Sequence, residues 1–443
     1  MLPITSAPTS PGCVAVDGDR IAYVGDARQA PAGDDVDLGN TAVLPGLVNA
    51  HTHLELTAFR GLIGDVSFRD WILTLQAAKD AVMTPDDYLQ SARLGIVEGL
   101  ASGITTFADT CDSGQVLQAM RELGVRGIMY REAFGPDPDQ CERSISELRA
   151  KIDRARPSET PLQRLGVSPH APYTVSDALF QAVAAYAREE RLPMAIHAAE
   201  SDVEMQLVRD AAGAFAEGLR ARGINVVPRG RSPIDLLERL GVLDVRPLLI
   251  HCVQADVDDI ATIARTGSAV AHCPLSNARL KHGIARLTEM LDAGVTVALG
   301  SDSMASNDEM DVLAEAQAAI LAQRARTFLD DLAAPSTAKV IELATLGGAR
   351  AIGLDGEIGS LEKGKVADMV AFELDDRATV ADVNEALIFP GTRCRVRIAM
   401  VAGNVLVRDG VVLGADPALG ARVGEIAQRL SLWKARKPLE SHQ

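Results

Sequence analysis

Residues 42–53 read AVLPGLVNAHTH, an apolar run that closes on two histidines, His51 and His53. Side chains two apart on an extended strand point to the same side, so both imidazoles are expected on one face. Seven further short apolar runs cover residues 103–110, 125–135, 164–172, 192–200, 246–253, 268–274 and 295–302. Amphipathic segments such as PDDYLQSARLGIVEGLASG (85–103) separate them. This alternation is typical of parallel βα units.

Eight such units within about 260 residues have the size and rhythm of a (β/α)8 barrel. A doubly wound open sheet is the alternative. It requires a glycine-rich phosphate loop after the first strand, and the sequence shows none there. We therefore predict an α/β fold built on a TIM barrel.

Both ends of the chain carry short alternating runs separated by glycine-containing turns, over residues 12–44 and 356–412. Neither set is large enough for a stable sheet by itself, so we expect the two to combine into one small β-sandwich. A helix is predicted over residues 417–434. The predicted division is therefore residues 1–44 (first part of the sandwich), 45–353 (barrel) and 354–443 (second part of the sandwich and terminal helix).

Composition places the chain among ordinary globular proteins, with 47% hydrophobic and 23% charged residues in 443. A formal net charge of -16 argues against nucleic acid or an anionic membrane as partner. The sequence contains neither a long apolar run nor a signal-peptide pattern, which favours a cytoplasmic location. Six cysteines without a CxxC pair suggest neither a disulfide scaffold nor a thiolate zinc site. The oligomeric state stays open, a homo-oligomer included.

Histidines carry the strongest functional signal. Six of the eight lie at or just past the carboxyl ends of predicted strands: His51, His53, His170, His197, His251 and His272. One histidine on a strand is usually a core residue. Six at the end of a barrel where active sites form indicate a site instead.

Four of these strand-end positions suit a metal ion. His51, His53 and His197 offer three neutral nitrogens, and Asp302 at the end of the eighth strand offers an oxygen. Three imidazoles and one carboxylate suit one divalent cation, with zinc favoured and iron or manganese as alternatives. For Asp302, a cap on the following helix is the competing interpretation.

A metal with an open coordination position supplies hydroxide near neutral pH, and that chemistry needs a proton shuttle. Glu200 follows His197 by three residues and is our general acid/base. His251 is expected to hydrogen-bond the attacking water and orient it, with direct ligation of the metal as the alternative.

The pieces PGLVNAHTH, SPHAPYTVS, AIHAAES, LLIHCV, AHCPLSNARLKHGIA and ALGSDSMASND, spread over residues 45–309, resemble the amidohydrolase superfamily, and within it the mononuclear-metal deaminases of adenine nucleosides. The resemblance implies metal binding at the positions of His51, His53, His197 and Asp302. It implies proton transfer by Glu200 and Asp302, and polarisation of water by His251. His170, where binuclear members carry a carboxylated lysine, implies one metal rather than two.

The resemblance also implies substrate contacts. His170 would touch the base or the 5′ side of the ribose. Asp80 stands, by spacing through Trp71, where methylthioadenosine and S-adenosylhomocysteine deaminases carry a ribose-binding glutamate. The shorter aspartate puts that contact in doubt. Glu55 and Trp71 complete the expected pocket.

Two stretches, HTHLELTAFRG and YREAFG, resemble aminodeoxyfutalosine deaminases of the alternative menaquinone route. That substrate carries a benzoate, so a cation is needed, and Arg131 is our candidate. The predicted activity is hydrolytic deamination of 6-amino-6-deoxyfutalosine. Alternatives are deamination of methylthioadenosine, S-adenosylhomocysteine or adenosine, a guanine deaminase or triazine hydrolase activity in the same site, and an inactive scaffold.

Overall fold

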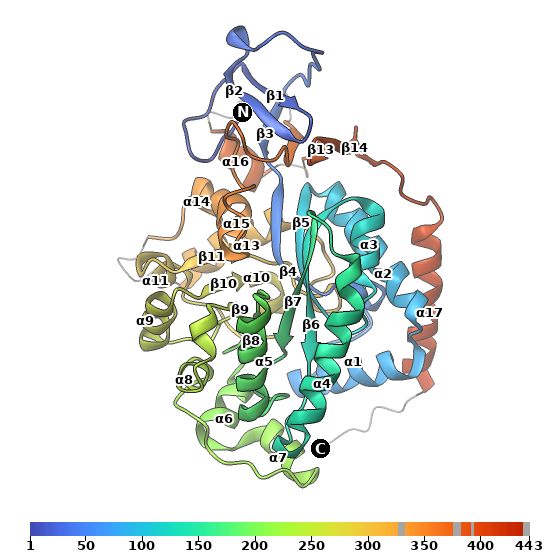
Figure 1. Ribbon diagram of the computed structural model, residues 1–443, viewed down its shortest axis with the longest axis vertical. Helices are drawn as coiled ribbons and strands as arrows, with labels where there is room; N and C mark the ends of the chain where they lie inside the picture. Colours follow the sequence, from blue (N-terminus) through green and yellow to red (C-terminus); the bar gives the residue numbers. More distant parts are fainter. Residues whose placement is uncertain (327–332, 375–381, 391–393, 437–443) are drawn as a thin grey trace.

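Eight parallel strands form a closed barrel at the centre of the computed structural model, which describes residues 1–326, 333–374, 382–390 and 394–436 (Figure 1). The strands are β4 (Leu47–Thr52), β5 (Ile104–Cys111), β6 (Arg126–Ala133), β7 (Gln163–Pro169), β8 (Ala195–Ala198), β9 (Leu248–His251), β10 (Ala269–His272) and β11 (Thr296–Leu299). They pair in the orders β4-β5-β6-β7 and β8-β9-β10-β11. Bridges between Val167 and Met194 and between Thr52 and Asp302 join the two halves. The predicted TIM barrel is confirmed, and each predicted apolar run holds one of its strands.

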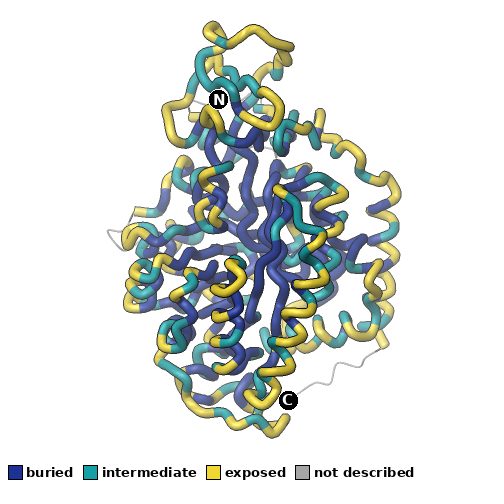
Figure 2. The backbone as a smooth tube through the Cα atoms, in the orientation of Figure 1, coloured by how far each residue is buried: buried dark blue, intermediate teal, exposed yellow. Residues whose placement is uncertain are grey.

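Helices surround the barrel and cover its apolar outer face, so the strands are the most deeply buried part of the chain (Figure 2). The helices between β4 and β8 are α1 (Phe68–Val82), α2 (Pro85–Ala101), α3 (Val116–Leu123), α4 (Cys141–Ala155) and α5 (Asp177–Glu190). Those between β8 and β11 are α6 (Asp202–Asp210), α7 (Gly213–Ala221), α8 (Pro233–Arg239), α9 (Val257–Thr266), α10 (Pro274–Arg279) and α11 (Leu287–Asp292). After β11 come α12 (Met304–Asn307), α13 (Val312–Arg326), α14 (Thr337–Glu342), a π-helical turn (Leu343–Gly347) and α15 (Gly348–Ala351).

Local sequence explains where the helices begin. Thr84 precedes α2, and its hydroxyl accepts a hydrogen bond from the Asp87 N–H, while the Asp87 carboxylate accepts one from the Thr84 N–H. This reciprocal cap satisfies two backbone donors, and Pro85 starts the helix where no N–H is needed. Asp256 and Asp259 form the same arrangement at the start of α9.

The two chain ends meet, as predicted, in antiparallel β-structure. One sheet has the order β15-β14-β13-β12-β3, in which β3 (Thr41–Pro45) pairs with β12 (Met369–Glu373). The other strands of this sheet are β13 (Val396–Val401), β14 (Asn404–Arg408) and β15 (Val411–Val412), and α16 (Val383–Ile388) lies between β12 and β13 in sequence. The hairpin of β1 (Gly12–Asp17) and β2 (Arg20–Asp26) packs on it through a small core that includes Ile21, Leu361 and Met369. Since β3 leads directly into β4, the sandwich lies at the amino end of the barrel strands (Figure 1).

The terminal helix α17 (Leu419–Arg436) lies within two residues of its predicted bounds and packs against the barrel. Its buried face, which includes Leu430, shares a core with Phe59 and Trp71. Lys434 Nζ donates to the Leu62 carbonyl at 2.5 Å. The domain boundaries after residues 44 and 353 stay a prediction. None of the described helices is long and apolar enough to cross a membrane.

Candidate metal centre and active site

The first two histidines owe their orientation to a β-bulge in β4. Asn49 pairs with Phe107 and Thr52 with Asp109, so three steps along β4 match two along β5. A bulge re-aims the side chains that follow it. Thr52 bonds the outward-facing Asp109 at 2.7 Å, while His51 and His53 turn inward with ring centroids 4.8 Å apart.

Three histidines and one carboxylate converge at the carboxyl end of the barrel. Asp302 Oδ1 lies 3.2 Å from His51 Nε2 and 3.6 Å from His53 Nε2. The His197 ring centroid lies 4.9 Å from that of His51 and 5.4 Å from that of His53. Asp302 is fixed from behind, because its Oδ2 accepts a hydrogen bond from the Ser276 hydroxyl at 2.5 Å.

The donor set fits one divalent metal ion. His197 Nδ1 bonds the His170 carbonyl at 3.0 Å, which leaves Nε2 as its ligand atom. Burial lowers the pKa of His53 and His197 well below the ordinary histidine value, so both are neutral, as ligation requires. For Asp302, burial alone would raise the pKa, but the hydrogen bond and charge of His51 hold it well below the usual range. His51, His53 and Asp302 place ligand atoms within 4.8 Å of one another.

Glu200 lies beside this cluster, buried between three possible hydrogen-bonding groups. Its Oε1 is 3.3 Å from His282 Nε2 and 3.6 Å from His251 Nε2, and Tyr173 donates its hydroxyl to Oε2 at 3.4 Å. Burial alone would raise the pKa of Glu200, but the nearby His251 and His282 rings lower it. His251 Nδ1 bonds Asn277 Oδ1 at 2.9 Å. Since that oxygen only accepts, Nδ1 carries the proton, and Nε2 is left to accept one from water.

The structure thus brings together seven of the predicted residues: His51, His53, His170, His197, Glu200, His251 and Asp302. Glu55 is buried at the rim, where its carboxylate accepts from the Ser113 N–H at 3.0 Å and pairs with Lys79 at 3.3 Å. His272 does not join them. It pairs in register with Leu299, whose side chain belongs to the outer core.

Three predicted substrate residues lie apart from the cluster. Tyr130 packs inside the barrel, so the next residue, Arg131, points to the outside of the barrel. The Arg131 guanidinium lies there against Gly114. Asp80 is exposed on α1 and accepts a hydrogen bond from Gln76 at 2.8 Å. Trp71 packs in the core beneath α17.

The sequence reasoning missed several residues that line the site: Lys79, Glu132, Tyr173, Asn277 and His282. Two signals were present. Tyr173 and His282 stand within stretches already singled out, SPHAPYTVS and AHCPLSNARLKHGIA. Glu132 lies two residues after Tyr130 on β6, so both side chains face the inside of the barrel, whereas Arg131 between them faces the outside.

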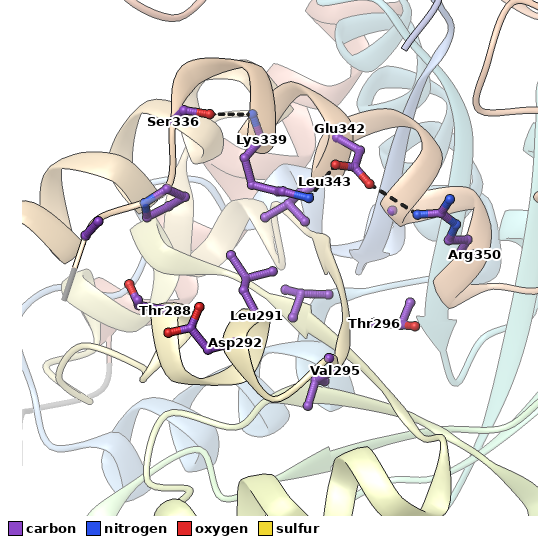
Figure 3. A pocket seen from close by; sticks show the side chains of 15 residues that line it. Thr288, Leu291, Asp292, Val295, Thr296, Ser336, Lys339, Glu342, Leu343 and Arg350 are labelled. Carbon is purple, nitrogen blue, oxygen red and sulfur yellow. Dashed lines mark hydrogen bonds and ion pairs between the residues drawn. The ribbon is translucent and has the colours of Figure 1, made fainter. Parts of the chain in front are cut away.

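A pocket of about 490 Å³ lies elsewhere, at the amino end of β11 (Figure 3). Its cations are both neutralised by Glu342, which pairs with Lys339 at 2.5 Å and with Arg350 at 3.1 Å. It contains none of the converging histidines, and active sites of such barrels form at the opposite end. The metal cluster is therefore the candidate active site.

The sequence model of the family described as "Amidohydrolase family" matches residues 42–406 of this chain. The chain belongs to the amidohydrolase family. The resemblance predicted from the strand-end motifs is thus confirmed.

Relatives of this amidohydrolase include proteins named 5-methylthioadenosine/S-adenosylhomocysteine deaminase. The one from Syntrophobacter fumaroxidans is 33% identical over 90% of this chain and 89% of its own length. The one from Halobacterium salinarum is 34% identical over 96% and 95%.

Solved structures agree with that placement. An adenosine deaminase from Xanthomonas campestris with bound zinc matches with a TM-score of 0.85 and 28% identity, over 97% of this chain and 96% of that one. Atrazine chlorohydrolase from Arthrobacter aurescens, complexed with zinc, matches with a TM-score of 0.80 and 25% identity, over 94% and 95%. The amidohydrolase is an enzyme of the hydrolytic deaminase type that acts on a carbon–nitrogen bond.

Proposed function

We propose that this amidohydrolase deaminates the 6-amino group of an adenine nucleoside, releasing ammonia. The observation that carries the proposal is Glu200, a buried carboxylate held between His251 and His282 beside three converging histidines and Asp302. The names of the 33% and 34% identical relatives and of the adenosine deaminase neighbour support a nucleoside substrate.

Glu200 has the position and the charge to move protons in this reaction. When bound, a divalent ion lowers the pKa of water toward about 7. Glu200 takes a proton from the attacking water and delivers it to the purine ring nitrogen, while His251 Nε2 accepts a hydrogen bond from the same water and orients it. Asp302 then accepts the remaining proton and passes it to the departing amine. Ammonia and a keto purine result.

The proposed metal is one zinc ion held by His51, His53, His197 and Asp302, with iron or manganese as alternatives. The zinc in two structural neighbours supports this choice. At the end of β7 the chain has His170, whose Nδ1 bonds the Thr174 hydroxyl at 2.7 Å. No bridging carboxylated lysine is available at that position, which supports a single ion.

Within the nucleosides we propose 6-amino-6-deoxyfutalosine, with methylthioadenosine, S-adenosylhomocysteine and adenosine as alternatives. The resemblance of HTHLELTAFRG and YREAFG to aminodeoxyfutalosine deaminases supports the narrower choice. Arg131 lies outside the barrel wall, so Lys79, at the rim beside Glu55, replaces it as the cation proposed for the benzoate.

A substrate panel tests both levels of the proposal. The zinc-loaded protein is incubated with the four nucleosides and a chlorotriazine, and ammonia, chloride and the purine absorbance are followed. Ammonia from any adenine nucleoside supports the class, and a marked preference for aminodeoxyfutalosine supports the narrower choice. A marked preference for the other three nucleosides would overturn the narrower choice. Chloride release without ammonia would overturn the nucleoside class.

A further inference from the structure

One buried carboxylate at the site has no role in the reaction described above. Glu132 is the last inward-facing residue of β6, in the alternation that places Ile128 and Tyr130 inside the barrel. It is 4% exposed, and among the described residues its Oε1 has no hydrogen-bond partner. A buried polar atom without a partner destabilises the folded protein, so a bound group that donates a hydrogen bond to Oε1 is expected.

The neighbours of Glu132 are committed elsewhere. His170 Nε2 is 4.0 Å from Oε1, beyond hydrogen-bond distance, and Nδ1 of the same ring bonds Thr174. Burial raises the pKa of Glu132 to about 8, a shift that the charge of Lys79 only partly opposes, and Lys79 Nζ hydrogen-bonds Glu55 at 3.3 Å. Glu132 therefore retains acceptor capacity for a group that the chain does not supply.

A second metal ion is a poor candidate for that group. Glu132, His170 and His197 place ligand atoms within 4.8 Å of one another, as a metal site would require. However, His197 Nδ1 bonds the His170 carbonyl, so only Nε2 has a free lone pair, and that atom is already assigned to the proposed zinc ion. One lone pair serves one metal, which leaves this trio one ligand short.

Exposure shows which way a substrate lies. The side chains at the rim around Glu132 are partly open, with His53 at 14%, His170 at 17% and Lys79 at 14%. Glu200 and His251 are deeper, at 5% and 2%; the Glu132 side chain is as buried as that of Glu200, at 5%, but its neighbours His170 and Lys79 lie on the open side. A nucleoside whose amino-bearing ring reaches Glu200 therefore leaves its sugar toward the open side. Phe134, half-exposed with its ring 5.0 Å from His170, lines the same side.

We propose that Glu132 binds the vicinal hydroxyls of the substrate's ribose and makes the enzyme selective for ribonucleosides over deoxyribonucleosides. The unpartnered Oε1 of Glu132 can accept a hydrogen bond, and a vicinal diol offers two hydroxyl donors. The inference rests on the proposed nucleoside deaminase activity. It moves the ribose contact from Asp80, which is exposed and bonded to Gln76, to a residue of the barrel wall.

The test compares adenosine with 2′-deoxyadenosine and 3′-deoxyadenosine in zinc-loaded wild type, Glu132→Gln and Asp80→Asn. A deoxynucleoside leaves a buried hydrogen-bonding group of Glu132 unsatisfied, so wild type should prefer adenosine by about 10- to 100-fold in kcat/KM. Glu132→Gln should lower the kcat/KM for adenosine and bring the three substrates within a few fold of one another.

Each result decides the inference. Loss of the preference in Glu132→Gln but not in Asp80→Asn supports it. The inference is overturned if Glu132→Gln prefers adenosine over the deoxynucleosides as strongly as wild type does. It is also overturned if only Asp80→Asn loses that preference. If Glu132→Gln does not fold, as zinc content and circular dichroism would show, the wild-type comparison still decides. Equal turnover of ribo- and deoxynucleosides by wild type overturns the inference and leaves the proposed function standing. Absence of ammonia from every nucleoside overturns both.

Discussion

Ser276 should control how tightly the metal ligand Asp302 is held. Its hydroxyl donates to Asp302 Oδ2 at 2.5 Å, on the side of the carboxylate away from His51 and His53. Ser306 reaches the same oxygen at 3.1 Å, but it also lies 3.1 Å from the Ser303 carbonyl. The Ser276 hydroxyl also lies 2.9 Å from the Ser306 hydroxyl, but its 2.5 Å contact with Asp302 is the shortest of these, so Ser276 is the principal donor to Oδ2.

Removing each hydroxyl therefore has a different expected cost. A buried hydrogen bond to a charged group contributes about 1.5–3 kcal/mol, and residues that orient a metal ligand typically change metal affinity by about 10- to 100-fold. Ser276→Ala should weaken zinc binding within that range, and Ser306→Ala by only a few fold. Competition with a chelator of known affinity, at fixed pH, measures both.

A matched control separates ligand orientation from the loss of a buried hydroxyl. Ser91 on α2 is equally buried, and in the described part of the chain its hydroxyl has no hydrogen-bond partner. Ser91→Ala should leave zinc affinity unchanged. The reasoning fails if Ser306→Ala weakens zinc binding as much as Ser276→Ala does, or if Ser276→Ala binds zinc like wild type.

Three further outcomes are expected. Glu200→Gln should retain wild-type zinc content by elemental analysis while kcat for ammonia release falls by about 10²- to 10⁴-fold, and full activity would contradict its role. Burial lowers the pKa of His272 to about 4, below the unfolded value of about 6.5. The unfolded chain thus takes up the proton first, and wild type should lose about 3 kcal/mol more unfolding free energy than His272→Phe between pH 6.5 and pH 4 in urea titrations; equal losses would refute this. Removing zinc with a chelator should lower the unfolding free energy by about 2.7 kcal/mol relative to protein at 100 times the zinc Kd, and zinc should restore it in thermal melts; an unchanged melting temperature would contradict a folded-state metal site.

The barrel could be predicted because its strands are buried on both faces and therefore appear as uninterrupted apolar runs. Each run ends where a polar residue meets the open end of the barrel, so the strand-end histidines and Asp302 could be placed as well. The bulge in β4 could not be predicted from the sequence. Two-residue alternation does place His51 and His53 on one side, but which side depends on the register in which Thr52 pairs with Asp109.

Substrate residues were harder to predict because one position along a strand decides which face a side chain takes. Arg131 and Glu132 are adjacent at the end of β6, and the chemistry of the expected anion favoured the arginine. The alternation of Ile128 and Tyr130 instead places Glu132 inside the barrel. On α1, one step along the helix likewise separates the partly buried Lys79 from the exposed Asp80.

The backbone at the site shows what holds its residues in position. Ala199, His251 and Asp302 have φ values of 51°, 74° and 56°, a left-handed region that residues other than glycine rarely adopt. Strain of this kind persists only where neighbouring contacts enforce it. The Asp302 N–H donates to the His51 carbonyl at 3.0 Å, which closes the barrel, and the buried Glu204 carboxylate accepts the N–H groups of Ala199 at 3.1 Å and Glu200 at 2.7 Å. Glu200 and Asp302, the proposed proton shuttle and metal ligand, are therefore positioned by hydrogen bonds to main-chain atoms, so the site's geometry is set by the barrel itself.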